Sequence, residues 1–439
     1  MGRRAGVLAA AGLLSLAGCS SLPTVPGLGF LSNGAQTAAA PVAGAPALSP
    51  VQANGETSHL ISGLLARRSV LEPGPLSEVA ETVLAANSRA AEAELRAAVL
   101  RSEAADKNWL PTLGPKVSLT NLGQVAASMV VDQVLFDNGR KKAEREIARA
   151  DVEVAAVALS QDTNDRVRDA LLLYLSAEAM EARSAVSEKA VERMRHFEWV
   201  MSERVRGGVS SPADHALVAQ KLAQMEADLA TDREAAARAR AELAAMAARP
   251  VDAIDGLSGL ALADPSLEPL SVVKAEAEAA RAMAVARAAR AGFLPGLSIG
   301  GSVGPDGTGL GLNAGVPNGV GFGMGASLAA VEAEARAAAA RTGEAREEAA
   351  RRRAGLEADI ASAEREAVET ARIATAAAET YDAFAEQLDA GLKNVPEVIG
   401  VFETAVAAAR EAATKPYEVA RARVELAAEL GVLVDGDDV

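Results

Sequence analysis

The sequence predicts a mainly α-helical protein with a small β part, built from two tandem copies of one helix–hairpin–long helix–helix unit. Half of the 439 residues are hydrophobic but only 3% are aromatic, a composition typical of long helices packed closely side by side. The stretch 140–206 contains neither proline nor glycine, as one very long helix requires. Several short motifs also recur at a nearly constant separation along the chain.

Composition excludes several classes of protein. One cysteine and three histidines are too few for a zinc or iron–sulfur site, so we expect no metal and no cofactor. The net charge of −15 disfavours a nucleic-acid binder. The chain contains neither a G-x-S-x-G nucleophile motif nor a G-x-x-x-x-G-K-[ST] phosphate loop, and we expect no enzymatic activity.

The first residues form a secretion signal. Arg3 and Arg4 precede a short apolar run, and Leu16-Ala17-Gly18-Cys19 then matches the site at which bacterial lipoproteins are cleaved and acylated. We therefore predict a signal peptide over 1–18 and lipidation of Cys19; ordinary secretory cleavage beside a chance cysteine is the alternative. Ser20 is not the aspartate that commonly retains lipoproteins at the inner membrane, which favours the outer membrane. Residues 19–75, rich in Pro, Gly, Ala and Ser, are predicted to be a lipidated tether.

Two separate motifs recur at the same offset. Pro111 within Trp-Leu-Pro-Thr-Leu and Pro295 within Phe-Leu-Pro-Gly-Leu lie 184 residues apart, and so do Pro212 and Pro396 in the Gly-x4-Pro turns. The pattern predicts a first repeat over 76–250 and a second over 266–431. Residues 251–265 would link the two repeats, and 432–439 would form an acidic tail.

The first repeat begins with a helical stretch that ends before Pro111. Apolar residues then alternate with polar ones, which predicts a β-hairpin over 113–136. The long helix is predicted over 139–206 and would span about 100 Å. A seven-residue spacing of apolar side chains along it indicates a supercoiled seam, formed by Val152, Leu159, Leu173, Met180, Met194 and Met201. A tight turn and a return helix complete the unit.

The second repeat follows the same order. Its hairpin is predicted over 296–320 and its long helix over 322–389. Twelve of the residues 296–325 are glycine, and glycine weakens strand propensity, so this hairpin is the least strongly predicted element.

In its motifs and in their order along the chain, the protein resembles the lipid-anchored branch of the TolC-like outer membrane factors. These are the exit ducts of bacterial efflux pumps and type I secretion systems. The resemblance covers roughly 76–433. It rests on the helix ending at Trp109-Leu110-Pro111, the Leu135-Phe136-Asp137-Asn138-Gly139 strand exit, the two Gly-x-x-[Ser/Asn]-x-x-[Asp/Glu] turns and the Arg-x-Glu-Leu-Ala motif near the end. The resemblance implies a homotrimer in which each subunit gives four strands to a twelve-stranded β-barrel above an α-helical tunnel.

Elementary physics supports the same arrangement. Four strands cannot close a barrel alone, and a barrel must close because every backbone group in lipid needs a partner. Four aromatic residues fall where helix meets strand and are predicted to lie at the membrane interface: Trp109, Phe136, Phe293 and Phe322. Ordinary packing is the alternative for these side chains.

The two helical turns at the far end would meet a partner. The resemblance implies that they dock a periplasmic adaptor and, through it, an inner-membrane pump or ABC transporter. The candidate gate and docking residues are Gly207, Gly208, Pro212, Asp214, Gly391, Asn394, Pro396 and Glu397. Efficient turns with ordinary N-terminal charges are the alternative.

Two functions stay open on the sequence. The first is a passive exit channel anchored in outer membrane lipid and extending into the periplasm. The second is a lipid-anchored periplasmic coiled-coil scaffold or adaptor without a pore. The hairpins at 113–136 and 296–320 discriminate between them, because only the channel needs membrane strands.

Overall fold

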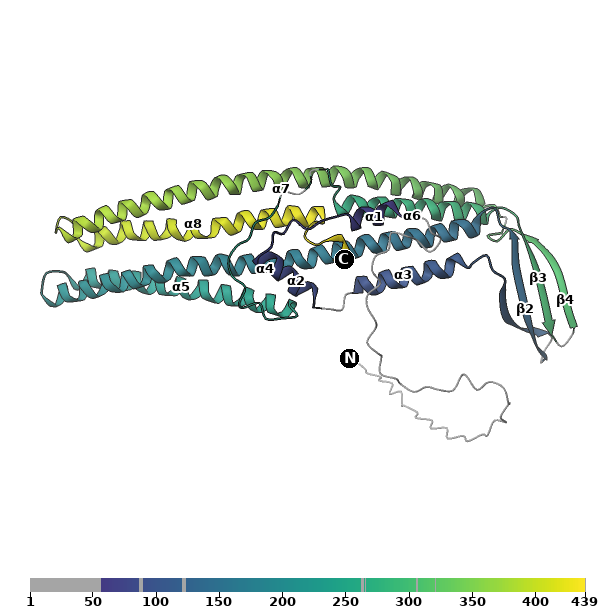
Figure 1. Ribbon diagram of the computed structural model, residues 1–439, viewed down its shortest axis with the longest axis horizontal. Helices are drawn as coiled ribbons and strands as arrows, with labels where there is room; N and C mark the ends of the chain where they lie inside the picture. The colour runs from purple at the N-terminus through teal and green to yellow at the C-terminus, as the bar shows by residue number, and fades with distance from the viewer. Residues whose placement is uncertain are drawn as a thin grey trace, which may run out of the picture. The chain divides into compact units, whose positions relative to one another are not determined.

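The computed structural model describes residues 57–86, 90–120, 124–261, 264, 266–304, 307–319 and 321–438. These residues belong to one compact unit spanning Pro46–Val439. The unit is mainly helical, about 73%, with one small antiparallel sheet (Figure 1). The predicted signal peptide, Cys19 and residues 121–123 of the first predicted hairpin lie outside the described residues.

The first half of the described chain holds five helices and two strands. Three helices come first: α1 (His59–Leu65), α2 (Pro75–Leu84) and α3 (Ala90–Asp106). Strands β1 (Thr112–Thr120) and β2 (Gln124–Phe136) follow, then α4 (Arg140–Arg206) and α5 (Pro212–Met246).

The second half runs through α6 (Leu270–Gly292), β3 (Gly296–Gly304), β4 (Gly307–Gly315), α7 (Met324–Asp389) and α8 (Val395–Leu430), then a short 3-10 helix, η1 (Gly436–Asp438). The order helix, two strands, long helix and return helix thus occurs twice. That the halves are copies of one unit stays a prediction.

The helix α4 forms the spine of the molecule. Its 67 residues span about 100 Å at the α-helical rise, and it packs against α2, α3, α5, α6 and α8. Leu159, Met194 and Met201 of the seven-residue pattern are buried, and the other three positions are half-buried. Ser187, which interrupts the pattern, is buried as well, because it lies beside a buried ionic cluster described below.

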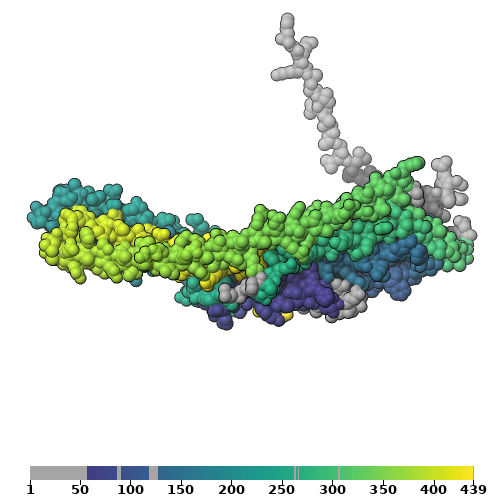
Figure 2. Space-filling view, turned by 90° about the horizontal axis from the view of Figure 1, so that it is seen from above, coloured from purple at the N-terminus to yellow at the C-terminus, as the bar shows by residue number. Residues whose placement is uncertain are grey.

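The helix α7 is exposed over most of its length. It packs against α6 and α8, and among its 66 residues only Ala338, Ala349 and Tyr381 are buried. Figure 2 shows α7 as the green band along the surface. One long side of α7 is thus left without a partner within the described chain.

The two ends of the described part of the chain pack more tightly than the sequence predicts. The predicted tether 19–75 includes α1 and the buried Val70, and the predicted helix before Pro111 is two helices, α2 and α3. The predicted tail 432–439 is anchored: Val432, Leu433 and Val434 are buried in the same core as Leu76 and Leu171. Backbone pairing joins the segments, since the Val70 N–H donates to the Val432 carbonyl at 2.9 Å.

The linker between the halves is fixed to α4 and α5 by a buried polar cluster. The Gly256 N–H donates to the Glu178 carboxylate at 2.8 Å, and the Tyr174 hydroxyl donates to the Gly256 carbonyl at 2.7 Å. Arg240 pairs with Glu178 and donates to the Ile254 carbonyl. Burial raises the pKa of Glu178, and the Gly256 hydrogen bond and the Arg240 charge, which both lower it, offset this desolvation only in part.

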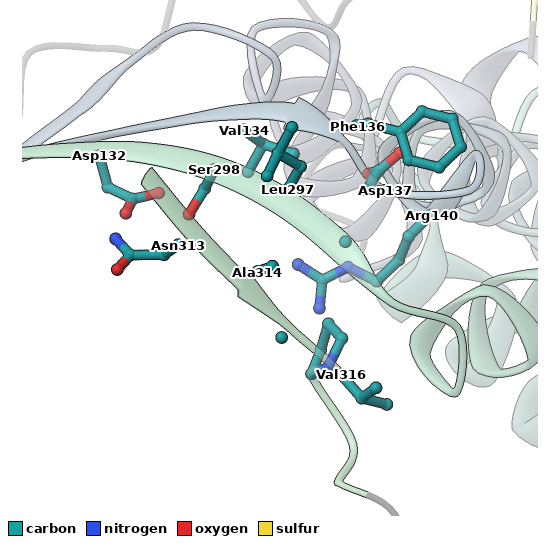
Figure 3. A pocket seen from close by; sticks show the side chains of 13 residues that line it. Asp132, Val134, Phe136, Asp137, Arg140, Leu297, Ser298, Asn313, Ala314 and Val316 are labelled. Atoms are coloured by element: carbon teal, nitrogen blue, oxygen red, sulfur yellow. The ribbon is translucent and has the colours of Figure 1, made fainter. Parts of the chain in front are cut away.

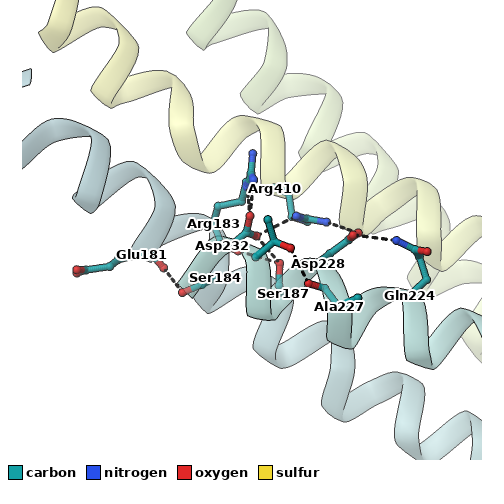
Figure 4. A network of polar contacts seen from close by, with 10 residues as sticks. Glu181, Arg183, Ser184, Ser187, Gln224, Ala227, Asp228, Asp232 and Arg410 are labelled. Carbon is teal, nitrogen blue, oxygen red and sulfur yellow. Dashed lines mark hydrogen bonds and ion pairs between the residues drawn. The ribbon is translucent and has the colours of Figure 1, made fainter. Parts of the chain in front are cut away.

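A second cluster of ionic side chains joins helices α4 and α5 to helix α8. Asp232 of α5 is completely buried and accepts hydrogen bonds from Arg183 of α4 and Arg410 of α8, the latter at 2.9 Å (Figure 4). Arg410 also donates to Asp228 at 3.0 Å. Arg410 thus ties α8 directly to α5, and an ion pair of Lys221 with Glu403 at 3.0 Å joins the same two helices nearer the tip.

We predict that Asp232→Ala lowers the free energy of unfolding by about 3–5 kcal/mol, because the two arginines lose their buried counter-ion. Denaturant unfolding of the detergent-solubilised protein, followed by circular dichroism, measures this. Arg195→Ala is the matched control: it breaks an exposed pair between the same helices, with Glu226, and should cost about 1 kcal/mol or less. Equal losses in the two variants would contradict the prediction.

Candidate functional site

The four strands form one sheet in the order β1-β2-β3-β4, antiparallel throughout. Pairing of β2 with β3 joins the two halves of the chain, with Met129 opposite Val303 and Val131 opposite Gly301. The strands are 9, 13, 9 and 9 residues long. Both predicted hairpins are therefore strands, and the glycine-rich one ends at Gly315, before its predicted limit of 320.

One face of this sheet is apolar and solvent-exposed. Because side chains alternate between faces along a strand, the register places Leu113 opposite Val131 and Ile299 opposite Leu312 on one face. The exposed apolar side chains of this face are Leu113, Val117, Met129, Val131, Val303, Leu310 and Leu312. An apolar face this continuous, which no described segment covers, indicates contact with another apolar phase or partner.

The opposite face is polar or bare. It carries Lys116 opposite Ser128, Asp132 opposite Gly300, and Ser298 opposite Asn313. Val130 and Val134 also lie on this face, but most of its positions in β3 and β4 are glycine or serine. The glycines make room for neighbours: a Cβ at Gly300 would lie 3.2 Å from the Asn313 amide nitrogen.

A cavity of about 320 Å³ opens at the helical end of the polar face. Asp132, Ser298 and Asn313 line it from the sheet, and Arg140 extends toward them from the start of α4 (Figure 3). The cavity thus marks the passage from the polar sheet face to the helices.

The corner from β2 into α4 is built by three consecutive residues. Asn138 and Gly139 both have left-handed backbones, with φ of 56° and 86°. The Asp137 carboxylate accepts hydrogen bonds from the Gly139 N–H at 3.1 Å and the Lys141 N–H at 2.6 Å, which caps the helix. The Asn138 amide donates to the Pro295 carbonyl at 2.9 Å and so ties this corner to the one between α6 and β3.

The four predicted interface aromatics all lie at helix–strand corners. Trp109 is 60% exposed and Phe136 is 58% exposed, while Phe322 is fully exposed. Phe293, the C-cap residue of α6, is half-buried. Packing within the described chain therefore does not account for three of the four side chains.

The first tip joins α4 to α5 through Gly207–Ser211. Gly208 has a φ of 74°, a left-handed backbone that favours glycine, whereas Gly207 has an ordinary φ of −79° and no such need. Pro212 opens α5, and Asp214 completes a capping box with Ser211: the Asp214 N–H donates to the Ser211 hydroxyl at 3.1 Å.

The second tip repeats this chemistry with different residues. Gly391 has a φ of 73°, and Asn394 caps α8 by accepting the Glu397 N–H at 3.0 Å. Pro396 lies in the first turn of α8. The eight predicted tip residues thus gather into two turns, four in each, and most of them cap or reverse the helices there.

Two features near the tips are absent from the sequence predictions: a cluster of aromatic side chains and the cap that Ser211 provides for α5. Phe197, Tyr381 and Phe402 pack together from α4, α7 and α8, with ring centroids 5.0 Å apart for Tyr381 and Phe402. The capping role of Ser211 could have been predicted from the sequence, because Ser-x-x-Asp before an apolar run is typical of a capping box. The contact among the three aromatic side chains could not be predicted, since they come from distant parts of the sequence.

The histidines do not form a metal site. His215 bonds the Glu198 carboxylate at 2.6 Å, and His196 stacks on Trp199. Within the described ranges no group of three potential ligands could hold a metal ion. Among the same residues, no helix is both long and apolar enough to pass through a bilayer.

Comparisons with known proteins identify the fold. No protein-family model and no curated protein matches the chain. Among solved structures, a membrane protein from Pseudomonas aeruginosa matches with a TM-score of 0.73 at 18% identity, over 84% of this chain and 92% of that one.

Two similar structures are named as outer membrane channels. The Campylobacter jejuni channel CmeC matches with a TM-score of 0.70 at 12% identity, over 82% of this chain and 86% of that one. The Neisseria gonorrhoeae channel MtrE, in its open state, matches with a TM-score of 0.66 at 18% identity, over 87% of this chain and 94% of that one. The chain therefore has the fold of these outer membrane channels, the fold that its resemblance to TolC-like factors implied.

Proposed function

We propose that this chain is the outer membrane exit channel of a tripartite efflux pump or type I secretion system, a passive conduit across the periplasm and the outer membrane. The observation that carries the proposal is the sheet with one exposed apolar face at the end of helices about 100 Å long. Strands of 9 to 13 residues match the length that a membrane strand needs, about 9–11 residues. Paired strands favour the channel over the scaffold without a pore, which would need no apolar sheet.

The proposal requires a homotrimer. Strands β1 and β4 are the edges of the sheet, and no described strand pairs with their outer sides. Unpaired backbone groups cannot face lipid, so a neighbour must supply the pairing, and three subunits would give the twelve strands of a closed barrel. The unpartnered side of α7 supports the same conclusion, because a second copy would cover it.

The polar sheet face would then line the channel. Its glycines keep side chains out of the lumen, and Lys116 and Asp132 are its charged residues in the described chain. The aromatic corners at Trp109, Phe136, Phe293 and Phe322 would lie at the periplasmic interface of the bilayer.

We predict that Leu312→Arg blocks assembly in the outer membrane, whereas Asn313→Arg does not. The two residues are neighbours on β4 but lie on opposite faces, and an arginine facing lipid costs about 2–4 kcal/mol at the midplane. Membrane fractionation and native mass spectrometry of the extracted protein measure both insertion and subunit number.

The wild type and Asn313→Arg should give a membrane-inserted species of three subunits. An inserted trimer in Leu312→Arg would refute the assignment of this face to lipid. A wild-type monomer or dimer in the membrane would refute the homotrimer.

The two tips are proposed to dock a periplasmic adaptor. They lie at the opposite ends of α4 and α7 from the sheet, where a partner tied to the inner membrane could reach them. Val209 and Leu392 expose 69% and 76% of their surface there. Exposed apolar side chains on turns otherwise built from polar caps are suited to burial against a partner.

We predict that the double variant Val209→Arg/Leu392→Arg abolishes export without loss of the trimer. Both residues are exposed, so folding tolerates the change, while charge opposes burial against an adaptor. The matched control Val209→Ile/Leu392→Met keeps the apolar surface and should export normally.

Export and trimer abundance are measured together in cells. Normal export by the arginine variant would exclude the docking role of these residues. Gly208 and Gly391 are unsuited to this test, because their positive φ strains any other residue and confounds docking with folding.

Cys19 is proposed to carry the lipid anchor. We predict that Cys19→Ser abolishes incorporation of a labelled fatty acid, because the thiol is the acylation site in the Leu-Ala-Gly-Cys motif. The trimer should persist, since the barrel also holds the protein in the membrane. Labelling that survives in the variant would show that the motif is not a lipidation site.

A further inference from the structure

A group of basic side chains lies just below the sheet, in a chain whose net charge is −15. Arg140, Lys141 and Lys142 occupy the first turn of α4, which contains no acidic residue. This arrangement opposes the helix dipole, which favours carboxylates at a helix N-terminus. The Asp137 carboxylate caps this helix end and Arg140 pairs with Glu144 at 3.5 Å, whereas Lys142 has no ion-pair partner among the described residues.

Some of these side chains converge with those of a second helix. Lys142 of α4 faces Arg287 and Arg290 of α6 across a cavity of about 360 Å³. Arg287 pairs with Glu146 at 2.8 Å, but neither Lys142 nor Arg290 has an ion-pair partner among the described residues. Three cations and one carboxylate thus share a single cavity, which leaves an excess of positive charge.

The same cavity has an apolar side. Leu294, which is 44% exposed, lines it together with Ala143 and Ala291. Leu294 is two residues before β3, and the hydrogen bond from Asn138 to Pro295 holds the two corners beside each other. The cavity therefore lies where the apolar sheet face begins.

We propose that this cavity binds the phosphate headgroup of an anionic phospholipid in the periplasmic leaflet of the outer membrane. Lys142 and Arg290 hold the phosphate oxygens, since ammonium and guanidinium groups are the side chains that bind phosphate most strongly. Leu294 contacts the glycerol and the start of the acyl chains. The inference rests on the proposed position of the sheet in the membrane, because that position puts the cavity at the level of the headgroups.

The geometry favours a lipid over a free anion. A soluble phosphate would need only the cations, and would leave the exposed Leu294 on the apolar side of the cavity facing water. A phospholipid matches the cationic and the apolar sides of the cavity at once.

The test uses the full chain, inserted into nanodiscs of phosphatidylethanolamine with a minor fraction of phosphatidylglycerol. Native mass spectrometry of the released protein counts the lipids retained on each subunit. The test variant is Lys142→Gln/Arg290→Gln. The matched control is Lys189→Gln/Arg193→Gln, which removes two exposed positive charges from the tip half of α4.

The wild type and the control should retain phosphatidylglycerol in preference to phosphatidylethanolamine. In the test variant, the ratio of retained phosphatidylglycerol to phosphatidylethanolamine should fall about 10-fold, because each basic residue near a membrane surface attracts anionic lipid. Equal retention of phosphatidylglycerol by the test variant and the wild type would overturn the inference.

Two further outcomes separate this inference from the proposed function. An inserted wild type that retains both lipids equally, or that releases phosphatidylglycerol in millimolar inorganic phosphate, would overturn the lipid site and leave the channel intact. A wild type that stays out of the bilayer in every preparation would overturn the membrane position of the sheet and the lipid site with it.

Discussion

The backbone pairing of β2 with β3 is the interaction on which the functional arrangement depends. It joins strands from the two halves of the chain and fixes the register in which Val131 lies opposite Gly301. A shift of one residue in this pairing would move the apolar side chains of one hairpin to the polar face. The continuous apolar face, and with it the proposed contact with lipid, exists only because the two hairpins share one register. The outer edges of β1 and β4 have no partner strand among the described residues, and the proposed neighbouring subunits would pair with them.

Below the sheet, very long helices pack together largely through small side chains. Alanine allows close approach but buries little apolar area for each residue, and the larger core residues gather in separate clusters along α4. Between the cluster around Leu175 and the cluster around Met194, buried ion pairs connect the helices. Asp232 accepts from arginines on two other helices, and Glu178 fixes the linker between the halves. Buried ion pairs add little net stability over apolar packing, but they tolerate only matched partners and so specify which helices meet.

The two ends of the helices carry different chemistry. At the sheet end, left-handed residues Asn138 and Gly139 turn the chain into α4 beside exposed aromatic rings and a basic cavity. At the far end, compact capped turns expose only small apolar patches at Val209 and Leu392. One end is suited to a lipid surface and the other to a protein partner, as the proposed channel would require. The exposed side of α7 connects these ends and is where neighbouring subunits would meet.

The sequence by itself determined the order of elements, the long helices, the hairpins and the tip turns, because these follow from local signals. Proline and glycine mark the breaks at 111 and 207–212, and alternation marks the strands. Only the tertiary structure decided that the described end of the supposed tether and the tail form part of the core, since Val70 and Val432 are brought together although they are 362 positions apart (432 − 70). It alone also decided which charges pair inside the bundle and which converge on one cavity. Lys142 and Arg290 are 148 positions apart, and no local pattern of sequence records a contact that depends on how two helices pack.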